Sequence, residues 1–183
     1  MLPAAIALLC LTSQVPATVI GMDGKTHHPV SEAGGIPVAL VFISHDCPIC
    51  NGYAPEICRL AKQFKGKAAV ELIYAEPDLS PAQANKHAKE YGLLSVPRFL
   101  DGTRLFAESC GATVTPQAIV YNELGKKVWS GRIDDRYVRI GIQRNEATTH
   151  DLRSAVDAIV HHRQPKPAAG GPVGCFILKP GIS

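Results

Sequence analysis

The chain has 183 residues, of which 46% are hydrophobic and 19% are charged, and its formal net charge is +3. This balance is typical of a soluble globular protein, and the length suffices for one domain with its own core. Basic residues form no block and aromatic residues make up only 6%, so we expect no nucleic-acid-binding surface. Six cysteines are too few for a disulfide scaffold but enough to indicate a redox or metal role.

The first 17 residues resemble an export signal. An apolar stretch at 4–11 is too short to span a bilayer, and residues 15–17 offer a cleavage site with small residues. We therefore predict a signal peptide at 1–17, loss of Cys10, and a periplasmic or secreted mature chain without a stable membrane anchor. The basic segment that usually precedes the apolar stretch is missing, so a cytoplasmic chain is the alternative.

Two cysteines, Cys47 and Cys50, stand where a predicted strand gives way to a predicted helix. The apolar run 38–43 is typical of a strand buried on both faces, and Pro48 suits the first position of a helix. A helix N-terminus favours negative charge, so the pKa of Cys47 should be lowered and its thiolate should be the nucleophile. A structural disulfide is the alternative, but this placement is typical of reversible redox chemistry.

The rest of the chain alternates between predicted strands and helices, which indicates an α/β fold with a parallel core. An N-terminal hairpin should pair 18–21 with 25–30, and the helix after Cys50 should run to about Phe64. The later elements are a strand over 69–74, a helix from Ser80 to Gly92, a strand over 97–100, a helix over 103–110, strands over 118–121 and 127–129, and a last helix that starts between Thr148 and Asp151.

Several of these features together resemble the thioredoxin-like superfamily, and in particular its redoxin or AhpC/TSA (alkyl hydroperoxide reductase/thiol-specific antioxidant) branch. They are the strand before Cys47 and Cys50, a proline inside the next helix (Pro55), and Thr115-Pro116 before a second apolar strand. The resemblance covers roughly residues 18 to 163. It implies a central mixed sheet with helices on both faces, an N-terminal hairpin, and an insertion before a cis-proline.

The same resemblance implies a function and a set of site residues. Cys47 would attack a substrate disulfide and Cys50 would resolve the mixed disulfide, which makes the chain a thiol-disulfide oxidoreductase. Pro116 would be the cis-proline facing the sulfurs, and Thr115 would bind substrate peptide through its backbone. The partners would be protein disulfides, protein dithiols or a redox partner protein, with no cofactor and no metal. The residues leave the proton acceptor open among His45, Asp46 and Glu56.

Two other functions compete with disulfide exchange. A peroxiredoxin-like peroxidase would use Cys47 as its peroxidatic thiol, and Ser44 three positions earlier matches half of that family's signature. However, Leu40 stands where the signature has a proline, and Gln117 stands where an arginine is expected. A redoxin-fold copper carrier would bind a soft ion through the two thiolates and a histidine.

Residues 164–183 are rich in proline and glycine, which predicts an extended, flexible tail after the domain. The tail carries Cys175, followed by apolar residues that favour docking onto the body. We consider Cys175 a candidate third redox thiol that pairs with Cys110 as a static clamp, exchanges with Cys47, or cross-links two chains.

Other features are expected to be structural. Cys58 and Cys110 should be buried free thiols, although Cys110 is close enough in sequence to Pro116 to lie near the site. The arginine-rich stretch 131–136 should be a solvated loop with weak ion pairs, and the alternatives are that it gates the site or binds an anionic group.

Overall fold

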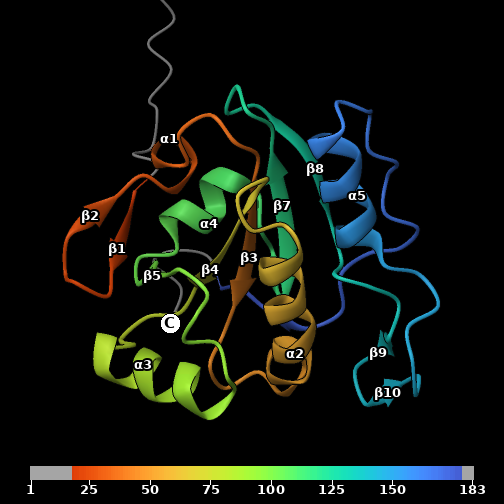
Figure 1. Cartoon of the computed structure of the whole chain (residues 1–183). Coiled ribbons are helices and arrows are strands. Elements are labelled where there is room, and N and C mark those ends of the chain that lie inside the picture. Colours follow the sequence, from red (N-terminus) through yellow and green to blue (C-terminus); the bar gives the residue numbers. More distant parts are fainter. Residues whose placement is uncertain (1–17, 179–183) are drawn as a thin grey trace, which may run out of the picture.

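Strand β3 (Val38–Ile43) lies inside a seven-stranded sheet and ends just before the paired cysteines (Figure 1). The computed structural model describes residues 18–178, so the predicted signal peptide at 1–17 lies outside the described residues. All six residues of β3 are buried, because both faces of the sheet are covered. Burial on both faces explains why this strand is an unbroken apolar run.

The sheet is mixed, as expected, with the strand order β2-β1-β5-β4-β3-β7-β8. β3 runs parallel to β4 (Ala69–Tyr74) over its whole length and antiparallel to β7 (Gln117–Tyr121). Two small sheets pair β9 with β10 and β6 with β11. The other strands are β1 (Val19–Gly21), β2 (Thr26–His27), β5 (Arg98–Leu100), β6 (Val114–Thr115), β8 (Lys127–Gly131), β9 (Tyr137–Arg139), β10 (Ile142–Gln143) and β11 (Cys175–Phe176).

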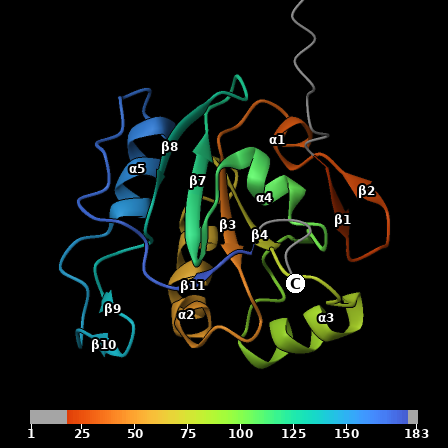
Figure 2. The same cartoon turned by 180° about the vertical axis from the view of Figure 1, so that it is seen from behind.

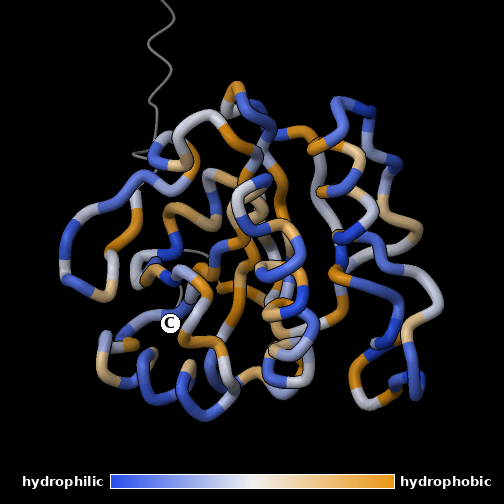
Figure 3. The backbone as a smooth tube through the Cα atoms, in the orientation of Figure 1, coloured by the Kyte–Doolittle hydropathy of each residue, from blue (hydrophilic) through white to orange (hydrophobic). Residues whose placement is uncertain are grey.

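Helices cover both faces of the sheet, which confirms the predicted fold class. The helices are α1 (Pro29–Glu32), α2 (Pro48–Gln63), α3 (Pro81–Glu90), α4 (Leu105–Cys110) and α5 (Asp151–Val160). Residues of α2, α3 and α5 pack around one apolar cluster, here called the α2 cluster, which includes Val41 and Ile57. The α4 cluster, with Phe42 and Phe106, lies on the opposite face under α4 (Figure 2). Figure 3 shows the apolar residues gathered in the central strands.

Local sequence signals explain several helix boundaries. Ser80 caps α3 as predicted, because its side chain accepts a hydrogen bond from the backbone of Gln83 and the Gln83 side chain accepts one in return. The expected second strand of the N-terminal hairpin is wrong beyond His27. Pro29 begins α1 instead, and the Glu32 carboxylate accepts a hydrogen bond from the backbone N–H of His28 at 2.9 Å.

The tail follows the body closely and contains no helix within its described part. The indole Nε1 of Trp129 donates to the carbonyl of Lys166 at 2.9 Å, and the backbone N–H of Ala169 donates to the Asp151 carboxylate at 3.0 Å. These contacts hold the tail along β8 and α5 before it reaches β11. In residues 18–178 no helix is both long and apolar enough to cross a bilayer.

Glu71 on β4 is an acidic side chain buried on the α4 side of the sheet. Only 9% of its surface is exposed, and its Oε2 atom has no hydrogen-bond partner within residues 18–178. Burial, assisted by the negative charge of Glu32, raises the pKa of Glu71 from 4.5 to about 7. The native state therefore favours the protonated carboxyl group.

We predict that Glu71→Gln increases stability at neutral and higher pH. Between pH 4.5 and about 7 the native chain binds more protons than the unfolded chain, so the free energy of unfolding of the wild type falls as pH rises through this window and then levels off. The substitution should remove that fall and stabilise the protein by up to roughly 3 kcal/mol above pH 7. Urea unfolding at several pH values would measure it.

Glu90→Gln, on the exposed side of α3, serves as the matched control and should leave the pH dependence as in the wild type. The prediction would be contradicted if the free energy of unfolding of Glu71→Gln fell with pH as steeply as that of the wild type.

Candidate redox site

Cys47 occupies the N-cap position of α2, directly after the loop that leaves β3. Pro48 takes the first helical position, where a missing N–H has no cost. The next backbone N–H groups, those of Ile49 and Cys50, help to lower the pKa of the Cys47 thiol, although the Cys47 side chain makes no capping hydrogen bond. The free amides of the first turn therefore favour a negative charge on the Cys47 sulfur without a capping hydrogen bond to it.

The two cysteines of the pair have opposite acidity. A hydrogen bond from the Cys50 thiol is the main cause that lowers the pKa of Cys47 to about 5, against the opposing effect of burial. The helix amides and the Cys175 thiol act in the same direction as Cys50. Burial raises the pKa of Cys50 well above its ordinary value. At neutral pH the pair therefore consists of a Cys47 thiolate and a protonated Cys50.

Thr115 and Pro116 face this pair from the start of β7. The Thr115–Pro116 peptide bond is cis, and the Thr115 carbonyl oxygen lies 3.4 Å from the Cys47 sulfur. In its thiol form Cys47 donates to that carbonyl, whereas the thiolate keeps only the donors described above. Burial raises the pKa of Cys50, and the nearby Thr115 side chain opposes this rise. The structure thus places all four residues together.

Cys175 lies against the same sulfur. Its thiol donates to the Cys47 sulfur at an S–S distance of 3.3 Å. β11 carries it there by pairing antiparallel with β6, with Cys175 opposite Thr115. Cys47 is 1% exposed and Cys50 is 3% exposed, whereas Cys175 is exposed. Cys175 is therefore the most solvent-exposed of these three cysteines.

The other two cysteines lie away from the site. Cys110 is buried in the α4 cluster, against which Tyr121 from the far end of β7 also packs. The prediction that Cys110 is a buried free thiol is therefore confirmed. The alternative in which Cys110 clamps Cys175 has no support here, because the Cys175 sulfur lies against that of Cys47. Cys58 is partly exposed rather than buried, and its thiol donates to the carbonyl of Gly92 at 3.2 Å.

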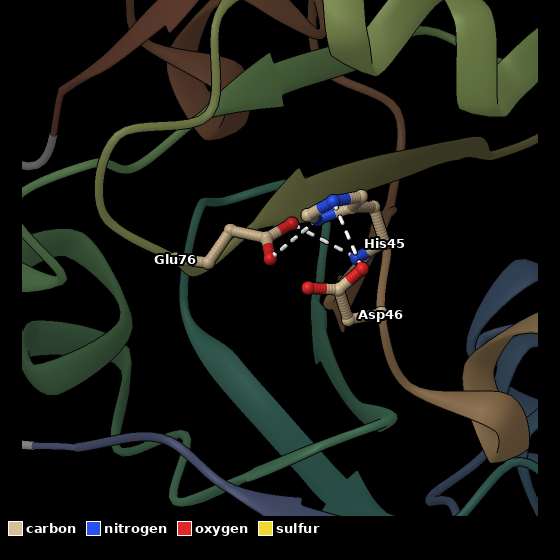
Figure 4. Close-up of side chains that lie close together, drawn as sticks. All are labelled: His45, Asp46 and Glu76. Carbon is tan, nitrogen blue, oxygen red and sulfur yellow. Dashed lines mark hydrogen bonds and ion pairs between the residues drawn. The ribbon is translucent and has the colours of Figure 1, made fainter.

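A polar group of three residues borders the site at the ends of β3 and β4 (Figure 4). The ring nitrogens of His45 pair with Glu76 at 2.8 Å and with Asp46 at 3.0 Å. Their ligand atoms lie within 4.8 Å of one another, so the trio could hold a cation. Glu76 also accepts hydrogen bonds at 2.8 Å from the Ser44 hydroxyl and from the His45 backbone. The ring nitrogens of His45 and the carboxylate of Glu76 thus already have ion-pair or hydrogen-bond partners.

Glu56, considered above as a proton acceptor, has a structural role. Its carboxylate pairs with Arg153 at 2.7 Å and also with Arg59, and the residue is only 6% exposed. The pair with Arg153 connects α2 to α5, whereas Arg59 lies on α2 itself. Glu56 is therefore a poor candidate for the proton acceptor, because two arginines already engage its carboxylate.

The stretch 131–136 is not a solvated loop as expected. The buried Asp134 carboxylate accepts a hydrogen bond from the Tyr53 hydroxyl at 2.7 Å. The Arg136 guanidinium lies 4.9 Å from the Tyr53 ring centroid and donates to the Gly52 carbonyl. This stretch braces the first turns of α2, and so it stabilises the helix that begins at Cys47.

Comparisons with known proteins agree with this geometry. The family model described as the AhpC/TSA family matches residues 13–128, which is more than half of the chain. No curated protein matches the chain.

Solved structures show the same fold at low sequence identity. A hypothetical protein from Sinorhizobium meliloti 1021 is 22% identical with a TM-score of 0.75, over 90% of this chain and 91% of that one. An uncharacterized conserved protein from Geobacillus kaustophilus is 22% identical with a TM-score of 0.74, over 91% and 89%. A secreted Mycobacterium tuberculosis disulfide oxidoreductase homologous to E. coli DsbE is 16% identical with a TM-score of 0.54, over 79% and 94%.

We predict that the Cys47 thiol of the reduced protein titrates with a midpoint near 5. Cys50→Ala should raise this midpoint, because it removes the hydrogen bond that contributes most to stabilising the thiolate. Ultraviolet thiolate absorbance as a function of pH would measure both values. Cys58→Ala is the control and should leave the titration unchanged, whereas a wild-type midpoint near the ordinary value of 9.0 would refute the assignment.

Proposed function

This chain belongs to the AhpC/TSA family, and from that premise we propose that it is a thiol-disulfide oxidoreductase acting through Cys47 and Cys50. The observation that carries the proposal is the geometry of the pair: Cys47 is the N-cap of α2, Cys50 is buried beside it, and the cis Thr115–Pro116 bond faces Cys47. The lowered pKa of Cys47 and the raised pKa of Cys50 agree with it. A thiolate is the reactive form in disulfide exchange, and a nearby protonated thiol supplies the second step.

In the proposed reaction the Cys47 thiolate attacks one sulfur of a substrate disulfide. A Cys47–substrate disulfide forms, the substrate's own disulfide breaks, and its other sulfur leaves as a thiolate. Cys50 then gives up its proton, which balances the charge of the departing substrate thiolate, and attacks the Cys47 sulfur. The substrate leaves fully reduced and Cys47–Cys50 is oxidised. The reverse sequence oxidises a dithiol.

The proposed substrates are proteins with disulfides or dithiols, or a redox partner protein. An extended peptide would pair with the backbone of Thr115 beside Pro116, because a strand edge recognises peptides of many sequences through main-chain hydrogen bonds. The Thr115 carbonyl lies 3.4 Å from the Cys47 sulfur, so a strand bound there would bring its own sulfur close to Cys47.

We further propose that this chemistry takes place outside the cytoplasm. The support is the signal-like sequence at 1–17 and the likeness in fold to a secreted disulfide oxidoreductase. The proposed layout is a signal peptide at 1–17, a redoxin domain at 18–163 and a tail at 164–183.

A peroxidase with Cys47 as the peroxidatic thiol is the second candidate, favoured by the family match and by the Cys47 thiolate. Two observations disfavour it. The Ser44 hydroxyl donates to Glu76 rather than to Cys47, and no arginine is among the hydrogen-bond partners of the Cys47 sulfur within residues 18–178. A copper carrier is disfavoured because both ring nitrogens of His45 pair with carboxylates.

We predict that Cys47→Ser abolishes insulin reduction and that Cys50→Ser accumulates mixed disulfides with insulin, because the resolving thiol is missing. Both substitutions should be made together with Cys175→Ser, so that the tail thiol cannot replace Cys50. Non-reducing electrophoresis and mass spectrometry would detect the trapped species. Full turnover by the Cys50→Ser protein would instead indicate the peroxidase function.

We also predict a reduction potential for the Cys47–Cys50 couple between about −270 and −120 mV. A Cys47 pKa of about 5 stabilises the reduced form at neutral pH, which makes the couple more oxidising than thioredoxin. Equilibration of the Cys175→Ser protein with glutathione buffers would give the value. A potential below about −300 mV, typical of a structural disulfide, would contradict the prediction.

A further inference from the structure

The C-terminal strand β11 occupies the edge at which the proposed function places a substrate peptide. β11 pairs antiparallel with β6, with Cys175 opposite Thr115 and Phe176 opposite Val114. The Thr115 hydroxyl donates to the Cys175 carbonyl at 3.5 Å. Figure 2 shows β11 beside the start of β7, at the end of the sheet where α2 begins. An external peptide cannot use the same edge while β11 is bound.

The docking of β11 is specific. The backbone N–H of Ile177 donates to the carbonyl of Thr113 at 2.9 Å, and the Ile177 side chain packs against the α4 cluster. Side chains alternate along the strand, so Phe176 points outward and is 80% exposed, whereas Cys175 and Ile177 contact the body. This alternation directs the Cys175 thiol to the Cys47 sulfur.

Gly174 makes the close approach possible. A Cβ atom at this position would lie 1.9 Å from the Thr115 carbonyl oxygen and 3.0 Å from the Pro116 nitrogen. Both are backbone atoms, which cannot move aside as a flexible side chain can. A glycine is therefore required for β11 to lie in its observed place.

We propose that β11 is an intramolecular substrate strand that fills the docking edge at Thr115. Its Cys175 exchanges with the Cys47–Cys50 disulfide to form a Cys47–Cys175 disulfide, which excludes external substrates. The proposal deepens the proposed function and rests on it for the supply of the oxidised Cys47–Cys50 pair. The observation behind it is the 3.3 Å separation between the Cys175 and Cys47 sulfurs, together with the burial of Cys47 beneath the strand.

The exchange step is balanced without any further oxidant. The Cys175 thiolate attacks the Cys47 sulfur of the Cys47–Cys50 disulfide, the Cys47–Cys175 bond forms and the Cys47–Cys50 bond breaks. Cys50 leaves as a thiolate and takes up the proton that Cys175 lost. The net step moves one proton from Cys175 to Cys50 and changes no charge, and Cys50 ends as a buried thiol.

Disulfide mapping tests the covalent part. The purified full chain is reduced, oxidised with oxidised glutathione, quenched in acid, alkylated and digested with trypsin. The expected product links the tail peptide 164–183 to the peptide 26–59. Because the latter also contains Cys58, the link should persist in Cys58→Ala and disappear in Cys47→Ala. Recovery of Cys175 solely as an alkylated free thiol, with Cys47 linked to Cys50, would overturn the proposal.

Two glycine substitutions test the docking part while all cysteines are kept. Gly174→Ala should displace β11, remove the link between 164–183 and 26–59, and increase the rate of insulin reduction by roughly tenfold, which corresponds to about 1.4 kcal/mol of docking free energy. Gly171→Ala is the matched control in the same tail, because a Cβ there meets no atom within 4 Å, and it should behave like the wild type.

The outcomes separate the two proposals. One outcome would overturn the intramolecular strand and leave the proposed function standing. In it the wild type contains no disulfide between peptides 164–183 and 26–59, and three variants reduce insulin at equal rates: Gly174→Ala, Gly171→Ala and Cys175→Ser. A link in the wild type, together with inactivity of all three variants toward insulin, would support the Cys47–Cys175 exchange and overturn the proposed substrate class. Thermal unfolding of Gly174→Ala verifies that the variant is folded, and the mapping of the wild type does not depend on it.

Discussion

The stabilisation of negative charge on one buried sulfur is the interaction on which the rest of the site depends. Cys47 is almost wholly inaccessible, and burial alone would keep it protonated. The N-terminal amides of α2 and the thiols of Cys50 and Cys175 reverse that preference. These donors are held by the fold: β3 fixes where α2 begins, and the contacts of Asp134 and Arg136 brace its first turns. The reactivity of Cys47 therefore depends on the order of the first turns of α2.

Much of the architecture could be predicted because its signals are local. The unbroken apolar run of β3 and the capping residues Ser80 and Gln83 give strand and helix positions from near neighbours in the sequence. The place of Pro116 could not be derived in this way, because it faces Cys47 across a long stretch of chain. It was available only through the family resemblance, and the structure gives its peptide bond as cis.

The features that were missed depend on contacts between distant segments. Glu76 follows β4 as His45 follows β3, and the ends of neighbouring parallel strands meet at one edge of a sheet. That rule would have found the pair. No comparable rule places the 131–136 stretch, because its aspartates are buried by partners on α2 and by the segment before α5. The path of the tail depends likewise on single contacts, such as Trp129 with Lys166, which composition does not reveal.

The attachment of Cys175 to the same chain as Cys47 has a consequence for how the site competes with its surroundings. A tethered thiol has an effective concentration that is set by the geometry of the chain and not by the amount of protein present. Dilution dissociates an enzyme from a soluble inhibitor, but it does not lower the effective concentration of Cys175 at Cys47. An external disulfide or thiol must therefore compete with a fixed local concentration, and its success depends on its own abundance and on how tightly it binds the edge that β11 holds.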